Sequence, residues 1–191
     1  MCLVGLAVAG LFFTGCSTQR ILISVDKASP EKAMVIGKFK VNYNGQDITK
    51  DSAIYFDSSV FGLDESGYLF LEFPVGQNAI RGVEKRWSAI THRYGAEELT
   101  FQLAGGGAVN YLGDITMDWH GVGNGAAWGA LIGGELVGGI AGGAVVQAQA
   151  TKGGIVITVE TNAAAAQAAF QKKFSTNRPI TPALLVVKPR Q

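Results

Sequence analysis

The chain has very little cysteine for its 191 residues. Only Cys2 and Cys16 are present, and both lie at the amino terminus. Cleavage before Cys16, which the motif described below predicts, would remove Cys2 and leave a mature protein with a single cysteine. The mature protein therefore has no internal disulfide, even in an oxidising compartment.

Charge is also sparse, and it is evenly balanced. Charged residues make up 16% of the chain, against about a quarter in an average soluble domain. The 16 basic and 15 acidic residues give a formal net charge of +1. Aromatic residues, at 9%, are not interleaved with the basic ones. The sequence has no electrostatic footprint for nucleic acid, and we expect no nucleic-acid partner.

The residue patterns that support catalysis are missing as well. The two histidines, His92 and His120, lie in unrelated segments, and no Gly-x-Ser-x-Gly elbow occurs. The glycine-rich stretch lacks the Gly-Lys-Ser/Thr of a phosphate loop, and Gly121-x-Gly123 does not continue into a dinucleotide fingerprint. We therefore expect no catalytic residue and no cofactor.

One weak candidate metal site remains. Asp114, Asp118 and His120 lie at even spacing along a predicted strand, so their side chains share one face. The simpler interpretation is a solvated strand face that carries polar residues. A second polar cluster, formed by Lys85, Arg86, Trp87, His92 and Arg93, indicates an exposed strand end or loop rather than a ligand site.

The amino terminus carries the most specific motif. Residues 3–13 form an apolar run of the length of a signal-peptide core, too short to span a bilayer. It ends in Phe-Thr-Gly-Cys at residues 13–16, followed by Ser17. This resembles a lipobox, the processing site of bacterial lipoproteins, although Phe13 stands where leucine is usual and no Lys or Arg precedes the run. The alternative is a core segment with an incidental cysteine.

The resemblance implies how the chain is processed and where it resides. Residues 1–15 would be the signal peptide, and residues 16–20 a lipidated tether. Cys16 would carry a diacylglycerol thioether, and its new amino terminus would take a further acyl chain such as palmitate. Two or three acyl chains anchor a protein stably to membrane lipid. Ser17 after the anchor favours a cell-envelope location at the outer membrane, if the organism has one.

Residues 21–191 have the pattern of a single β domain. In residues 33–43, Lys38 and Lys40 alternate with Gly37, Phe39 and Val41, as in a half-buried antiparallel strand. Asn-Gly at residues 44–45 predicts a hairpin. The spacing of strands and turns predicts a mainly β fold, an antiparallel β-sandwich, with strands at 21–25, 33–43, 53–56, 68–73, 78–83, 98–103, 108–119, 153–160 and 184–187.

One helix is predicted near the carboxyl end, at about residues 162–175. Thr161 or Asn162 would cap it, and Phe170 and Phe174 stand four apart on one face of its alanine-rich body. Two lysines in its last turn suit the helix dipole.

A short turn pattern lies between two of the strands. Asp64 and Gly67 precede an aromatic run, and Pro74 and Gly76 follow it. This pattern loosely resembles prealbumin-like and carboxypeptidase-regulatory-like β-sandwich modules, which occur in many surface proteins. The resemblance implies a sandwich without a catalytic role.

The predicted insertion at residues 120–152 is rich in glycine and carries one charge between residues 121 and 150. Glycines recur every four residues and then change register once, at Gly121, Gly125, Gly129 and Gly133 and at Gly134, Gly138 and Gly142. Rows of small residues let helices pack closely in an apolar medium, whereas in water each glycine weakens a helix by about 1 kcal/mol. We expect a helical hairpin that turns near the change of register.

The segment resembles the glycine zippers of bacterial surface lipoproteins, including the rickettsial 17-kilodalton antigen type. Its flanking strands, near Trp119 and Ile155, should belong to one domain, which disfavours a single membrane crossing. Each arm of about fifteen residues spans roughly 22 Å, short of a ~30 Å hydrocarbon core. The hairpin then dips into one leaflet, forms a homo-oligomer, or folds back as a soluble lid. A flexible low-complexity loop is the remaining alternative.

These observations favour a lipid-anchored structural or interaction protein of the bacterial cell envelope. Its glycine-zipper hairpin would mediate membrane insertion or self-association. The alternative is an envelope-anchored binding module for a sugar, peptide or protein, which an exposed aromatic patch including Trp87, Tyr94 or Trp119 would favour. An enzyme is the third and least favoured class.

Overall fold

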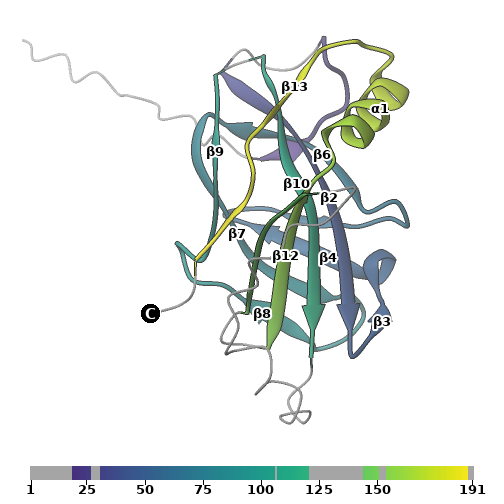
Figure 1. Cartoon of the computed structure of the whole chain (residues 1–191), viewed down its shortest axis with the longest axis vertical. Helices are drawn as coiled ribbons and strands as arrows, with labels where there is room; N and C mark the ends of the chain where they lie inside the picture. The colour runs from purple at the N-terminus through teal and green to yellow at the C-terminus, as the bar shows by residue number, and fades with distance from the viewer. Residues whose placement is uncertain (1–18, 27–30, 106, 121–143, 151–153, 189–191) are drawn as a thin grey trace, which may run out of the picture.

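The fold was analysed in a computed structural model, which describes residues 19–26, 31–105, 107–120, 154–188 and the backbone of 144–150. Within these residues the protein is mainly β, with strands in two sheets and one α-helix, α1, at Ala163–Phe174. Figure 1 shows the sheets as two layers, with α1 on the outside of one of them. The predicted mainly β class and the single predicted helix are therefore confirmed.

The first sheet contains the long central strands. Its order is β1 (Arg20–Ile21), β6 (Tyr68–Pro74), β2 (Lys32–Tyr43), β10 (Val109–Trp119), β12 (Ile155–Thr161) and β11 (Ala144–Ala150), with β3 (Gln46–Asp47) paired to β2 and β13 (Ile180–Pro182) paired to β10. The second sheet has the order β14 (Val186–Val187), β9 (Leu99–Leu103), β7 (Gly76–Lys85), β4 (Ser52–Phe56) and β5 (Val60–Gly62), with β8 (Thr91–Arg93) paired to β7. A short 3-10 helix, η1 (Thr49–Asp51), precedes β4.

The two sheets share one hydrophobic core, so the architecture is sandwich-like. Phe73 of the first sheet packs its ring edge-on against two rings of the second sheet, with centroids 4.9 Å from Phe56 and 5.6 Å from Phe101. All three side chains are almost completely buried. Interlocked aromatic rings of this kind bury large apolar areas and fix the separation of the two layers.

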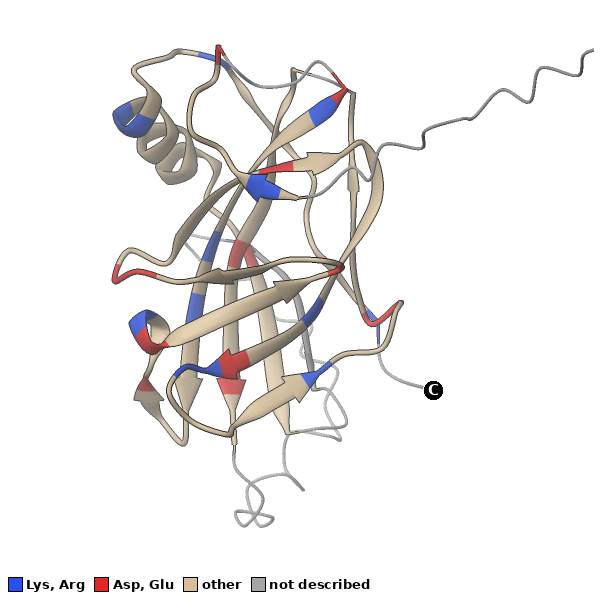
Figure 2. Ribbon diagram, turned by 180° about the vertical axis from the view of Figure 1, so that it is seen from behind, with Lys and Arg blue, Asp and Glu red and all other residues tan. Residues whose placement is uncertain are grey.

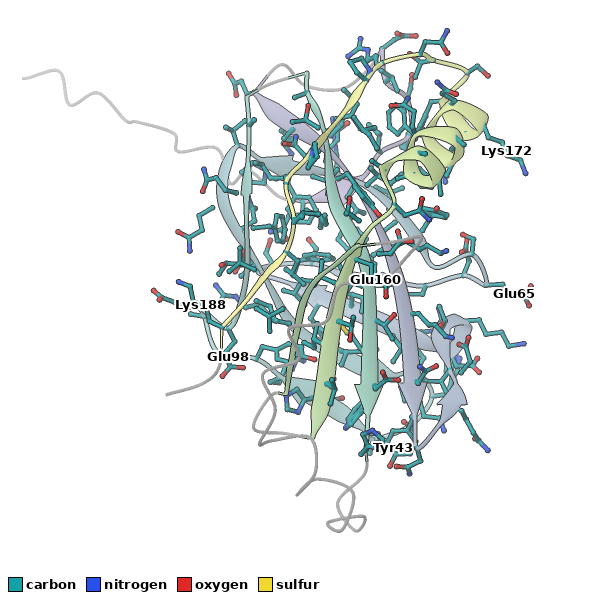
Figure 3. The ribbon with its side chains drawn as sticks, viewed as in Figure 1. Tyr43, Glu65, Glu98, Glu160, Lys172 and Lys188 are labelled. Carbon is teal, nitrogen blue, oxygen red and sulfur yellow. The ribbon has the colours of Figure 1, made fainter. Side chains whose placement is uncertain are left out.

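A smaller core lies on the outer face of the first sheet, under α1. Phe170 of the helix is fully buried there against Met34, Ile36 and Phe70, whereas Lys172 points away from the sheet (Figure 3). Asn162 caps the helix, because its side-chain oxygen accepts a hydrogen bond from the N–H of Ala165 at 3.4 Å. The helix explains why β2 is buried on both faces near its start and alternates only near its end.

Two predicted turns have the expected geometry. Asn44 and Gly45 both have positive φ, +50° and +81°, and connect β2 to β3. Before β6, the carboxylate of Asp64 accepts hydrogen bonds from the N–H groups of Ser66 at 2.8 Å and Gly67 at 3.1 Å. Gly67 has a φ of +68°, and a Cβ there would lie 2.1 Å from the carbonyl oxygen of Phe39. Both turns therefore require the residues that the sequence supplies.

The prediction of a wholly antiparallel sandwich is wrong, because the first sheet is mixed. The strands β2 and β10 run parallel, and so do β10 and β13. The chain leaves the first sheet after β3, builds β4 and β5 of the second, and after β6 builds β7, β8 and β9 there before it returns as β10. Such a long crossover frees two neighbouring strands from the antiparallel order that a hairpin imposes.

Several strand boundaries also differ from the prediction. The expected strand at 21–25 is reduced to the two residues of β1, and β5 and β8 were not predicted. These strands are three residues or fewer, too short to show an alternating pattern. The expected strand at 184–187 is reduced to β14, which pairs with β9.

The insertion begins and ends at one place. Trp119 lies opposite Ile155 in the β10–β12 pair, and the N–H of His120 donates to the carbonyl of Gly154 at 2.9 Å. The two flanking strands, β10 and β12, are therefore neighbours in one sheet. Within the predicted insertion at residues 120–152, residues 144–150 form a strand, β11, which is antiparallel to β12. The predicted helical hairpin falls on residues 121–143, which lie outside the described residues.

Candidate functional site

The predicted anchor and the predicted zipper lie outside the part of the chain that the structure describes. This holds for Cys16 and for the glycines at Gly121, Gly125, Gly129, Gly133, Gly134, Gly138 and Gly142. These residues stay predictions from the sequence. The structure does describe the points at which both segments join the folded domain.

Two of the candidate metal residues, Asp114 and Asp118, lie on β10 at even spacing, and His120 follows the end of the strand. Each of the two aspartates has a partner of its own. Asp114 accepts a hydrogen bond from the Tyr111 hydroxyl at 2.6 Å, and Asp118 accepts one from the Asn42 amide at 2.6 Å. No group of three or more His, Cys, Asp or Glu side chains that could hold a metal occurs within the described ranges. Asp118 therefore ties β10 to β2, whereas Asp114 accepts its hydrogen bond from a residue of its own strand.

The contact of Tyr111 with Asp114 also secures α1. The Tyr111 hydroxyl accepts a hydrogen bond from the backbone N–H of Asn162, the helix cap, at 3.1 Å. Burial, and then the hydrogen bond to Asp114, raises the pKa of Tyr111 well above its usual value. The hydroxyl therefore stays protonated and keeps donating to the carboxylate at physiological pH.

The described chain begins at a residue that is already packed into the domain. Gln19 is only 7% exposed. Its side-chain oxygen accepts hydrogen bonds from the N–H and the hydroxyl of Ser58, each at 3.3 Å, and its carbonyl accepts one from Ser59 at 3.2 Å. These serines precede β5, so Gln19 joins the incoming chain to the edge of the second sheet.

The next residue joins the incoming chain to the first sheet. Arg20 lies opposite Glu72 in the β1–β6 pair, and its Nε donates to the Glu72 carboxylate at 2.7 Å. Glu72 is 2% exposed, whereas Arg20 is about half exposed. A buried carboxylate is costly unless it is paired, so this ion pair fixes β1 onto β6. The incoming chain is thus attached to both layers of the protein.

Three neighbouring surface depressions begin near Gln19, where the described chain joins the domain. We call the surface that they form the tether edge. The first depression, of about 350 Å³, lies between the chain after β1 and the end of α1, and includes Ile23 and Lys173. The second, of about 250 Å³, includes Lys173, Ile21 and Val60. The third, of about 340 Å³, includes Val60 and Trp87. The three depressions are neighbours, because the first two share Lys173 and the last two share Val60 and Gly62.

Trp87 is the most conspicuous side chain of the tether edge. It is 90% exposed and has a φ of +60°, which is rare and strained for a bulky residue. The guanidinium of Arg86 lies 5.5 Å from its ring centroid. A Cβ at Gly62 would come within 2.5 Å of that guanidinium, so the small glycine leaves room for Arg86 on the edge strand. The prediction of an exposed loop at Trp87 is confirmed.

The other aromatic residues considered for a binding patch are buried. Tyr94 and Trp119 are each 6% exposed. The ring of His92 is half-buried between them, with centroids 4.8 Å from Tyr94 and 6.3 Å from Trp119. Burial raises the pKa of the Tyr94 phenol far above its usual value. The exposed aromatic patch is thus reduced to Trp87.

Charge does not mark a site among the described residues. Lys and Arg alternate with Asp and Glu over the ribbon, without a large region of one sign (Figure 2). Several charges are already paired, as in the contact of Arg81 with Asp57 at 2.5 Å and the hydrogen bond from Tyr55 to Glu84. Hydrogen bonding to Glu84 raises the pKa of Tyr55. The features that distinguish the tether edge are apolar exposure and position.

Gln19, Glu72 and Val60 were not predicted from the sequence. One signal was present, since Glu72 is the only charge in an otherwise apolar strand and Arg20 is the one basic residue of the predicted tether. No signal marked Val60, because its strand has only three residues.

Comparison with known proteins gives no relative. No family model matches the chain, no curated protein matches it, and no solved structure matches it. Over the described residues, no helix has both the length and the apolar character that a membrane crossing requires.

Proposed function

We propose that the protein is a lipid-anchored structural or interaction protein of the bacterial cell envelope, held to membrane lipid through acylated Cys16. The observation that carries this proposal is the position of Gln19. It is already packed and hydrogen-bonded into the domain three residues after the lipobox cysteine. Three residues reach at most about 11 Å, so the lipid would hold the domain directly against the bilayer.

The firm attachment of the incoming chain supports the same function. Any pull on the tether passes through Gln19 to the second sheet and through Arg20 to the first. A domain that only needed to float on a flexible linker would have no use for this attachment. Ser17 fits sorting to the outer membrane, and the resemblance of residues 64–76 to non-catalytic sandwich modules fits an interaction role.

The test of the anchor is the chemistry of the mature amino terminus. The full chain would be expressed in a bacterium that processes lipoproteins, and the purified protein analysed by mass spectrometry. We expect residues 1–15 to be absent and Cys16 to carry a diacylglycerol thioether. A Cys16→Ala chain should stay unprocessed. An unmodified Cys16 in the membrane-bound protein would refute the proposal.

The glycine-rich insertion is proposed to mediate membrane insertion or self-association. The geometry supports an excursion that starts and ends at one point, because His120 and Gly154 are joined by a hydrogen bond of 2.9 Å at its base. A two-residue Asn-Gly turn could therefore replace all 33 residues from 121 to 153. A protein that stays folded but loses its oligomers or its affinity for detergent would support this role.

A second variant distinguishes the contribution of the glycine rows to self-association from that of β11. Ala144 pairs with Thr161, six positions along β12 from the Ile155 that faces Trp119. At ~3.3 Å per residue this offset is roughly 20 Å, so a direct deletion of residues 121–143 cannot close. A Gly/Ser linker of about ten residues spans it. If this variant still oligomerises, β11 rather than the zipper is responsible.

The second candidate is a binding module for a sugar, peptide or protein of the envelope. The exposed ring of Trp87 favours it, because aromatic rings that stand free of the surface are common at recognition sites. A Trp87→Ala chain that loses binding to an envelope glycan while it keeps its stability would favour this candidate.

A further inference from the structure

The described residues include few large apolar side chains that are exposed, and most of them lie together. There are six, at Ile21, Ile23, Val60, Val75, Trp87 and Val186. Four of the six line the tether edge. Scattered exposed apolar residues need no explanation, whereas a contiguous set indicates a contact surface.

The continuity of this set follows from shared lining residues. Lys173 lines both the depression that contains Ile23 and the depression that contains Ile21. Val60 then lines both the second depression and the third, which contains Trp87. The four apolar side chains therefore follow one line, from the chain after β1, past the edge strand β5, to the turn after β7.

The line starts where the lipid would be attached. Ile21 follows Cys16 by five residues, and the intervening Gln19 and Arg20 are fixed to the two sheets. A lipid on Cys16 would hold Gln19, at the start of this line, within about 11 Å of the bilayer surface. No comparable geometry brings the opposite edge strand, β14, near the anchor, because β14 and β5 lie at the two ends of the second sheet.

We propose that the tether edge rests on the phospholipid bilayer, with Ile21, Ile23, Val60 and Trp87 at the level of the headgroups. This inference rests on the proposed lipid anchor and adds the orientation of the domain on the membrane. Tryptophan is enriched at this depth because its ring is apolar and its N–H is polar. The Trp87 ring is 90% exposed, so it stands where a bilayer can receive it.

Charge is nearly neutral along the tether edge, which specifies the kind of contact. Lys173 and Arg86 are accompanied by three acidic residues, Asp26, Asp64 and Glu84. Attraction to anionic lipids is therefore not the source of the contact. The contact would come instead from the burial of apolar side chains beside the covalent lipid. Salt does not screen apolar burial, so the orientation should persist at high salt.

The experiment places a fluorescent probe on each end of the second sheet of the full lipidated chain. Val60→Cys and Val186→Cys are matched variants, because both residues are valines on edge strands, 49% and 43% exposed. Acylated Cys16 leaves the new cysteine as the one free thiol of the mature chain. Each protein is labelled with a nitrobenzoxadiazole dye and reconstituted into vesicles of phosphatidylethanolamine and phosphatidylglycerol.

We expect the Val60 label to shift its emission to the blue and to lose emission when nitroxide lipids are included, in low and in high salt. The Val186 label should show neither change. If both proteins float with the vesicles and the Val60 label stays in water, or if both labels respond alike, the proposed orientation is refuted and the tether edge is left for a soluble partner. If neither protein floats, the lipid anchor itself has failed.

Discussion

At the scale of single residues, the turn before β6 depends on a glycine for two separate reasons. Gly67→Ala forces a φ of +68° on alanine and drives its Cβ into the carbonyl oxygen of Phe39, 2.1 Å away. We expect a loss of about 2 kcal/mol or more in the free energy of unfolding, measured in urea.

Gly45→Ala is the matched control for this prediction. Gly45 has a similar φ of +81°, but nothing lies within 4 Å of its missing Cβ. Gly45→Ala should lose only the cost of placing alanine at a positive φ, about 1 kcal/mol in the free energy of unfolding. Equal losses at the two positions would show that the close approach to Phe39 costs nothing.

A second residue-scale prediction concerns pH. Hydrogen bonding from the side chain of Thr49, and then from its backbone N–H at 2.9 Å, lowers the pKa of Asp47 below its usual 3.8. A carboxyl with a lowered folded pKa stabilises the protein above its unfolded pKa, and this contribution disappears as the pH falls through the folded pKa.

Asp47→Ala should therefore lower the free energy of unfolding at neutral pH and make little difference in strong acid. Because Asp47 is exposed, the loss should be small, about 0.5 kcal/mol. Asp47→Asn keeps an acceptor but does not titrate, so its difference from Asp47→Ala should not vary with pH. A difference between the wild type and Asp47→Ala that grows below pH 3.8 would contradict this account.

At the scale of elements, the two-residue strand β1 attaches the incoming chain to the first sheet. Arg20→Ala leaves the buried Glu72 carboxylate without its partner. We expect a loss of about 1–3 kcal/mol in the free energy of unfolding. Exchange of the amide hydrogen of Leu22, which donates to Phe70 at 2.9 Å, should also become faster.

A double-mutant cycle checks the cause. In a Glu72→Leu background no buried charge remains, so the further change Arg20→Ala should cost little. If Arg20→Ala lowers the free energy of unfolding equally in both backgrounds, the ion pair with Glu72 does not hold β1. Packing of the aliphatic part of Arg20 would then hold it.

The elements that the sequence predicted are those with long periodic patterns. The alternation of Lys38 and Lys40 with buried neighbours identified β2, and the paired Phe170 and Phe174 identified α1. The turn residues Asn44-Gly45 and Asp64 act locally, so they too were predictable. In each case the signal lies within a dozen residues of the chain.

The parts that were not predicted depend on contacts between distant segments. The parallel pairing of β2 with β10 joins residues about 75 positions apart, and no local pattern encodes it. The candidate site has the same origin, because Ile21, Val60 and Trp87 meet only after both sheets form. Exposure of Trp87 was foreseen from its polar neighbours, but its place on the line that begins at the tether was not.

At the scale of the whole molecule, the protein is a two-layered β domain, and its two distinctive segments join it at defined points. The acylated amino terminus would leave at β1, between the edges of both sheets. The glycine-rich insertion leaves and returns between β10 and β12. Anchoring and association can therefore be altered separately, without rebuilding the core.

The most direct test of the central claim is detergent phase partitioning of three chains. These are the full processed protein, a Cys16→Ala chain without residues 1–15, and the same chain with residues 121–153 replaced by Asn-Gly. We predict that the full protein enters the detergent phase and that the third chain, which lacks both segments, stays in the aqueous phase. The second chain shows how much the insertion contributes by itself. If the full protein stays in the aqueous phase, it has no lipid anchor and the account is wrong.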